Sequence, residues 1–139
     1  YTNQIDAFIK SHRLEKRVHL LHDVTFQYLP AIYQQAEIFV YPSRFEGFGI
    51  PIIEALHSGI PVIAATGSCL EEAGGPDSLY VHPDDKEGMT KAICSLLNHP
   101  EKRQHMIEQG LKYVTRFSEQ RQAEELMNLY RSLTEEKTI

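Results

Sequence analysis

The chain has 139 residues, of which 42% are hydrophobic and 24% charged, as is typical of one soluble globular domain. Its net charge is −5 at pH 7, and basic residues are dispersed among acidic ones, so we expect no nucleic-acid partner. No apolar run approaches the ~20 residues that span a bilayer, and the first ten residues lack the pattern of a signal peptide, so we expect a cytoplasmic protein.

The first third of the chain predicts a helix, a strand, a second helix and a second strand. Apolar residues in the first ten positions repeat at helical spacing (Ile5, Phe8, Ile9). Residues 18–21 are a short apolar run that predicts a strand. Thr25 can cap the second helix, whose apolar positions form one stripe: Leu29, Ile32, Tyr33 and Ala36. A buried strand is expected directly afterwards, at residues 37–41.

The middle of the chain predicts a βαβ unit. Pro42 ends the preceding strand, and a helix follows with Pro51 near its first position and Gly59 just past its end, an asymmetry that helices favour. Residues 61–65 predict the next strand, and two strands joined in this way run parallel. Because ligands of such sheets bind outside the carboxyl ends of the strands, we expect the loop at residues 43–49 to lie at the site.

The remaining elements are a loop at residues 66–78 with one helical turn at residues 70–73, a strand at residues 79–81 and three helices. Asp84 or Asp85 caps the first of these helices, and Ser118 caps the last. The last helix is expected to bury one apolar stripe: Ala123, Leu126, Met127, Tyr130 and Leu133. Residues 134–139 predict a polar tail.

This order of elements predicts an α/β fold, a Rossmann-like open parallel sheet flanked by helices. A doubly wound domain normally begins with a strand, whereas this chain begins with a helix. We therefore expect it to be part of a larger protein, with the first strands of the domain elsewhere.

The cysteines and histidines predict no metal site and no disulfide framework. Cys69 and Cys94 lie far apart and neither belongs to a CxxC pair, and the seven histidines are dispersed. We therefore expect no metal ion and no bound cofactor.

The segment from Pro42 to Glu54 places two glycines and two carboxylates at the start of a predicted helix. The unpaired backbone N–H groups of such a start attract an anion. Glu46 and Glu54 would repel a phosphate, but they can accept hydrogen bonds from uncharged sugar hydroxyls. The segment therefore predicts a site for a nucleotide sugar.

Two other interpretations of this segment remain open. Glu46 and Glu54 can be solvated charges, because acidic residues are favoured at helix starts in any case. The run Gly47-Phe48-Gly49 also resembles the beginning of a dinucleotide fingerprint, but Ile52 stands where the third glycine belongs, which makes this the weaker alternative.

The run from Glu46 to Glu54 resembles the Glu-x7-Glu signature of retaining glycosyltransferases of GT-B architecture, in glycosyltransferase family 4 (group 1). The resemblance extends to Ser58-Gly59-Ile60-Pro61, to Val81-His82-Pro83-Asp84 and to Phe117-Ser118, and so covers nearly the whole chain. It implies that residues 1–133 are part of the C-terminal, nucleotide-sugar-binding domain, one half of a GT-B fold. The N-terminal acceptor domain and a basic Arg and Lys pair that contacts the diphosphate would lie outside this chain.

The resemblance also implies roles for individual residues. The diphosphate would be bound by backbone N–H groups, those of Gly47, Phe48, Gly49 and Ile50. Glu54 would bind ribose hydroxyls, and Glu46 would bind the hydroxyls of the transferred sugar without being assigned as a nucleophile. Val24 and Thr25, at the carboxyl end of the strand predicted at residues 18–21, would contact the base.

The implied reaction is hexosyl transfer from a UDP- or GDP-sugar to an acceptor hydroxyl with retention of configuration. The acceptor would be a glycan or lipid-linked molecule bound by the missing N-terminal domain, which could also dock on the inner face of the membrane. The fragment alone would then be inactive. The alternatives are a free-standing nucleotide-sugar-binding module without turnover and a GT-B sugar epimerase.

Overall fold

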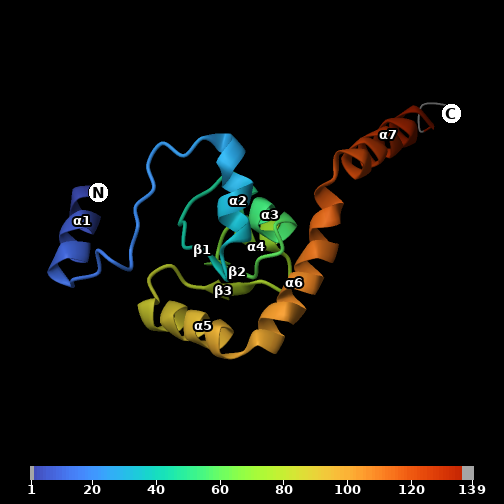
Figure 1. Ribbon diagram of the computed structural model, residues 1–139. Coiled ribbons are helices and arrows are strands. Elements are labelled where there is room, and N and C mark those ends of the chain that lie inside the picture. The colour runs from blue at the N-terminus through green and yellow to red at the C-terminus, as the bar shows by residue number, and fades with distance from the viewer. Residues whose placement is uncertain (1, 136–139) are drawn as a thin grey trace.

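The computed structural model describes residues 2–135 and contains a parallel sheet wrapped by helices (Figure 1). The strands are β1 (Phe39–Tyr41), β2 (Val62–Ala65) and β3 (Leu79–Val81), in the spatial order β1-β2-β3. Both neighbouring pairs are parallel, with Tyr41 opposite Ala64 and Ala65 opposite Val81. The predicted α/β fold is confirmed, as are the strands expected in the middle of the chain.

Two cores cover the two faces of the sheet, and β2 contributes side chains to both. Val62 and Ala64 face a core with α3 (Ile50–His57) and α4 (Leu70–Gly74). Ile63 points to the other face, where it packs with Leu96 of α5 (Lys86–Asn98). Since every residue of β2 is buried, this strand is the centre of the fold.

The starts of α3, α5 and α7 follow the chemistry expected from the sequence, whereas the cap expected from Thr25 is wrong, because its side chain makes no capping bond. Gly49 is the N-cap residue of α3, and Pro51 lies in the first turn. The Asp85 side chain accepts a hydrogen bond from the Gly88 backbone N–H at 2.8 Å and so caps α5. After α6 (Pro100–Val114) and η2 (Thr115–Phe117), Ser118 Oγ accepts from the backbone N–H of Arg121 at 3.4 Å, at the start of α7 (Glu119–Glu135).

The strand predicted at residues 18–21 is wrong. This run is irregular, between α1 (Thr2–Ser11) and η1 (Phe26–Tyr28), and Leu21 is 64% exposed. A strand needs a hydrogen-bonded neighbour, and no strand within residues 2–135 pairs with this run. In Figure 1 this segment runs from α1, which lies apart from the sheet, to η1 and α2 (Leu29–Gln34).

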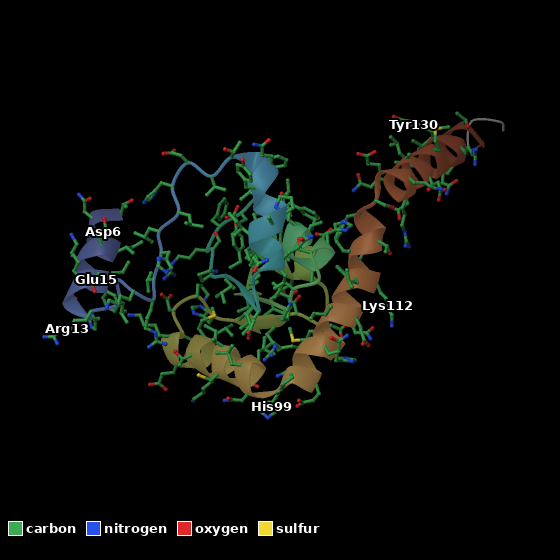
Figure 2. The ribbon with its side chains drawn as sticks, in the orientation of Figure 1. Asp6, Arg13, Glu15, His99, Lys112 and Tyr130 are labelled. Atoms are coloured by element: carbon green, nitrogen blue, oxygen red, sulfur yellow. The ribbon has the colours of Figure 1, made fainter. Side chains whose placement is uncertain are left out.

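The burial expected for the last helix is also wrong. α7 extends away from the sheet, and Tyr130 lies far out on it (Figures 1 and 2). Its long apolar side chains are about half exposed: Leu126, Met127, Tyr130 and Leu133. Thr134 and Glu135 belong to α7, and the rest of the predicted polar tail lies outside the described residues.

Among residues 2–135, no helix combines the length and the apolar character needed to cross a membrane.

Candidate functional site

The carboxyl edge of the sheet brings three loops together, as the sequence predicted for the loop after the first strand of the βαβ unit. They are residues 42–49 after β1, 66–69 after β2 and 82–85 after β3. Two contacts join them. Cys69 Sγ donates to the backbone carbonyl of Glu46 at 3.2 Å, and the Arg44 guanidinium forms a two-point ion pair with Asp84, Nη1 to Oδ2 at 3.0 Å. Arg44 therefore has a carboxylate partner.

The backbone at the start of α3 is fixed by a glycine. Gly49 has φ of +110°, the left-handed region that disfavours other residues, and a Cβ there would lie 3.0 Å from Leu70 Cδ2 and 3.1 Å from Ala73 Cβ. The loop therefore packs so closely on side chains of α4 that a larger residue at position 49 would force them to move.

The amides of this loop have no partner within the described chain. No residue between 2 and 135 accepts a hydrogen bond from the backbone N–H of Gly47, Phe48, Gly49 or Ile50. The first amides of a helix lack intrahelical acceptors, and the helix dipole adds partial positive charge there. Four successive donors are thus available to an anion at the sheet's carboxyl edge.

Glu46 is held by two hydroxyl groups. Tyr41 Oη and Ser43 Oγ each donate to the same carboxylate oxygen, Oε1, at 2.7 Å. The Tyr41 bond, and after it the Ser43 bond, lowers the pKa of Glu46 below its ordinary value. Glu46 is therefore an anion at neutral pH, and no residue of the described chain donates to its second oxygen, Oε2.

Glu54 lies in the second turn of α3 and faces a groove between α2 and α3. Tyr33 Oη donates to Glu54 Oε2 at 3.0 Å. The groove is mostly apolar and is lined by nine residues: Phe26, Leu29, Pro30, Tyr33, Gln34, Ile53, Glu54, His57 and Ser58. Such a hollow has room for a flat, partly apolar group beside the carboxylate.

A row of three aromatic rings connects the two carboxylates. The Tyr33 and Phe39 ring centroids lie 5.4 Å apart, and those of Phe39 and Tyr41 lie 5.8 Å apart with an interplanar angle of 16°. Burial raises the pKa of Tyr33 to about 12, with a smaller contribution from the hydrogen bond to Glu54. Burial and, after it, the hydrogen bond to Glu46 raise the pKa of Tyr41 to about 12 as well.

Sequence reasoning missed both tyrosines as functional residues and placed them in the core. One sequence signal could have found them. A half-buried tyrosine hydroxyl needs a hydrogen-bonding partner, so each of these tyrosines could have been expected to donate to one of the two acids of the signature.

The residues expected near the base do not lie where the sequence placed them. Without the strand at residues 18–21, Val24 and Thr25 are not at a strand's carboxyl end. Val24 is half-buried, and Thr25 is the exposed N-cap residue of η1, where its side chain makes no capping bond. Phe26, which follows directly, lines the groove that contains Glu54, so this turn still lies near the candidate site.

The side chains of Phe48 and Ile50 lie in different environments. Phe48 packs edge-on against Phe117, with ring centroids 5.6 Å apart. Ile50 is 63% exposed. The Phe48 contact anchors the loop to η2, so its shape depends on the C-terminal part of the fold as well as on the sheet.

The described residues form no cluster of metal ligands. Within residues 2–135 no three His, Cys, Asp or Glu side chains lie close enough to hold a metal ion, and Cys69 and Cys94 are both free thiols. The Glu71 carboxylate is bound by its neighbours in sequence, because it accepts hydrogen bonds from the Thr66 hydroxyl and from the Gly67 backbone N–H, the latter at 3.3 Å.

Comparison with known proteins identifies relatives over most of the chain. The family model described as glycosyl transferases group 1 matches residues 1–113. The O-antigen chain mannosyltransferase RfbU of Salmonella typhimurium is 37% identical over 101 residues, which are 73% of this chain and 29% of that protein. The O-antigen chain mannosyltransferase B of Escherichia coli is 34% identical over 105 residues, 76% of this chain and 28% of that protein. The chain thus spans under a third of these curated relatives.

Two solved structures have similar folds. Sucrose-phosphate synthase from Thermosynechococcus elongatus superimposes with a TM-score of 0.82 and 29% identity, over 97% of this chain and 35% of the other. The C-terminal domain of the group 1 glycosyl transferase LpcC from Francisella tularensis gives a TM-score of 0.70 at 24% identity, over 82% of this chain and 60% of that chain, which shows a shared fold.

Proposed function

The chain belongs to the glycosyl transferases group 1 family, and on that premise we propose that it binds the nucleoside-diphosphate-sugar donor of a retaining hexosyltransferase. The observation that carries this proposal is the row of amides at residues 47–50, which have no acceptor in the part of the chain that the structure describes. An ionised carboxylate lies on one side of this row, and a groove lined by a second carboxylate lies on the other. The acceptor, a glycan or lipid-linked molecule, would be bound by a part of the protein outside this chain.

The amides of Gly47, Phe48, Gly49 and Ile50 would bind the diphosphate. When the bond to the sugar breaks, negative charge accumulates on the leaving diphosphate, and fixed N–H dipoles stabilise that charge more in the transition state than in the ground state. The positive end of the α3 dipole acts in the same direction. The sequence has no aspartate-x-aspartate metal motif, so these amides, with basic groups outside the chain, would take the place of a cation.

Each of the two acids would bind one of the two sugar rings of the donor. Glu54 would accept hydrogen bonds from ribose hydroxyls, with the base in the groove beside Phe26, Val24 and Thr25. Glu46 would accept from hydroxyls of the transferred sugar. It is an acceptor in this proposal and not a nucleophile.

Isothermal titration calorimetry of the 139-residue chain with UDP-glucose and GDP-mannose tests the proposal. We expect weak binding of at least one donor, lowered by Glu54→Ala. Glu101→Ala is the matched control, because Glu101 is an exposed acid in the first turn of α6. Unchanged binding by Glu54→Ala would contradict the ribose role, and no binding of either donor by the unaltered chain would contradict donor binding.

A further inference from the structure

Glu46 uses one carboxylate oxygen for the protein, and no donor among residues 2–135 reaches the other. We propose that Tyr41 and Ser43 are positioning residues that saturate Oε1 of Glu46 and so direct Oε2 to two neighbouring hydroxyls of the transferred sugar. This inference rests on the proposed function and adds residues and a substrate feature to it.

The contacts around Glu46 restrain it from three directions. Tyr41 is the last residue of β1 and is paired in register with Ala64, so its position is set by the sheet. Ser43 follows two residues later, in the loop. The Glu46 backbone carbonyl accepts from Cys69 Sγ at 3.2 Å, which fixes the main chain from the side of α4. A carboxylate restrained at both its backbone and one oxygen has little freedom left at the other oxygen.

The Tyr41 ring is itself restrained. It stacks on Phe39 at 5.8 Å and is half-buried, so its hydroxyl cannot follow Glu46 if the loop moves. Holding a rotamer by packing is how a protein sets the geometry of a binding group.

Charge also favours an acceptor at Oε2. Both donors to Glu46 are neutral hydroxyls, and the nearby Arg44 is engaged by Asp84, so the carboxylate keeps its full negative charge. An ionised carboxylate oxygen has two lone pairs and no proton to donate. It therefore suits a pair of hydroxyls on adjacent carbons of a hexose, and a sugar that lacks one of them should bind less tightly.

A purely structural role for Tyr41 makes a different prediction. If its hydroxyl only supported the loop, its loss would weaken the binding of a nucleotide and of a nucleotide sugar by the same factor. If it positions Glu46 for the sugar, its loss weakens only the nucleotide sugar. The ratio of the two affinities separates these cases.

The experiment measures the affinities of GDP, GDP-mannose, UDP and UDP-glucose for the full 139-residue chain by calorimetry. In Tyr41→Phe and in Ser43→Ala we expect affinity for the nucleotide sugar to fall about fivefold while affinity for the matching nucleotide stays constant. Tyr80→Phe is the control, because it removes another half-buried tyrosine hydroxyl, one that donates to the Gly75 carbonyl at 2.7 Å and lies on β3. Its affinity ratio should equal that of the unaltered chain.

The pH dependence gives a second readout. The hydrogen bonds from Tyr41 and Ser43 lower the pKa of Glu46, so removing both raises that pKa. As the pH falls, Glu46 of the double variant with Tyr41→Phe and Ser43→Ala should therefore be protonated first, and this variant should lose the extra affinity for the sugar at a higher pH than the unaltered chain does. Thermal unfolding shows whether each variant is folded, and Ser43→Ala alone carries the prediction if Tyr41→Phe does not fold.

Equal losses for nucleotide and nucleotide sugar, or no loss for either, would overturn the positioning role and leave the proposed function intact. An unaltered chain that binds none of the four compounds would overturn the proposed function, and the positioning role with it.

Discussion

The Tyr33 hydroxyl on α2 donates a hydrogen bond to Oε2 of Glu54 on α3, over 3.0 Å and across 21 residues of sequence. Tyr41 makes the equivalent bond to Glu46, and the Phe39 ring contacts both tyrosine rings, stacked on Tyr41 and tilted by 54° to Tyr33. The two acids of the signature are therefore each paired with a tyrosine, and a row of three aromatic rings relates their positions.

These tyrosines predict a loss of stability at high pH. Tyr33, Tyr41 and Tyr80 have pKa values raised to about 12, in each case chiefly by burial, from the ordinary value of 10. A raised pKa in the folded state means that stability is fully present below pH 10 and is lost as the pH rises towards 12, because the unfolded chain ionises first.

Urea unfolding of the chain between pH 9 and pH 12 measures this loss. We expect Tyr33→Phe to lose less stability over that interval than the unaltered chain, because one of the shifted groups is gone. An exposed tyrosine on α7 provides the control, Tyr130→Phe, whose pH dependence should match the unaltered chain. Identical curves for Tyr33→Phe and Tyr130→Phe would contradict the assigned burial of Tyr33.

The two glycines of the loop should respond differently to alanine. Gly49 has φ of +110° and a Cβ there meets Leu70 and Ala73 at 3.0 and 3.1 Å, so Gly49→Ala should destabilise the chain by roughly 1–3 kcal/mol. A Cβ at Gly47 meets nothing within 4 Å, so Gly47→Ala should change stability little. Thermal or urea unfolding of both variants makes the comparison, and similar stabilities would show that the left-handed turn at Gly49 does not exist.

The burial of a leucine predicts how much stability its replacement by alanine costs. Leu96 on α5 is fully buried against Ile63, and Leu96→Ala should cost about 2–5 kcal/mol. Leu126 on α7 is 49% exposed, and Leu126→Ala should stay within roughly 0.5 kcal/mol of the unaltered chain. A large loss at Leu126, measured by urea unfolding, would mean that α7 packs against the body of the protein.

Local sequence signals were sufficient for the sheet and its connecting helices. Proline in the first turn and glycine after the last define α3, and the apolar run from Val62 to Ala65 becomes the buried central strand. Proline, glycine and apolar runs are local signals, which a pattern records directly. The partners that β2 needs, β1 and β3, are both present in the chain.

The failures lie where an element needs a distant partner. Residues 18–21 have strand-like composition, but no described strand is available to pair with them. The apolar stripe of α7 predicts burial, yet no described element covers it. An apolar pattern indicates which face can be buried and says nothing of whether a neighbour is present.

The sequence predicted where the candidate site lies, but it did not predict which side chains hold the two acids. The spacing of Glu46, Gly49 and Glu54 placed them correctly at the carboxyl edge of β1 and the start of α3. The hydroxyls that hold the acids come from residues 33, 41 and 43, and the first lies on a separate helix. Only the folded chain brings Tyr33 to Glu54.

The central claim is that the amides of residues 47–50 bind a diphosphate, and two-dimensional ¹H–¹⁵N NMR of the chain titrated with GDP and with UDP tests it most directly. We expect the amide resonances of Gly47, Phe48, Gly49 and Ile50 to shift most, in a saturable manner, while those of α5 and α7 stay in place. Saturable shifts confined to other residues, or no shifts at all, would contradict it.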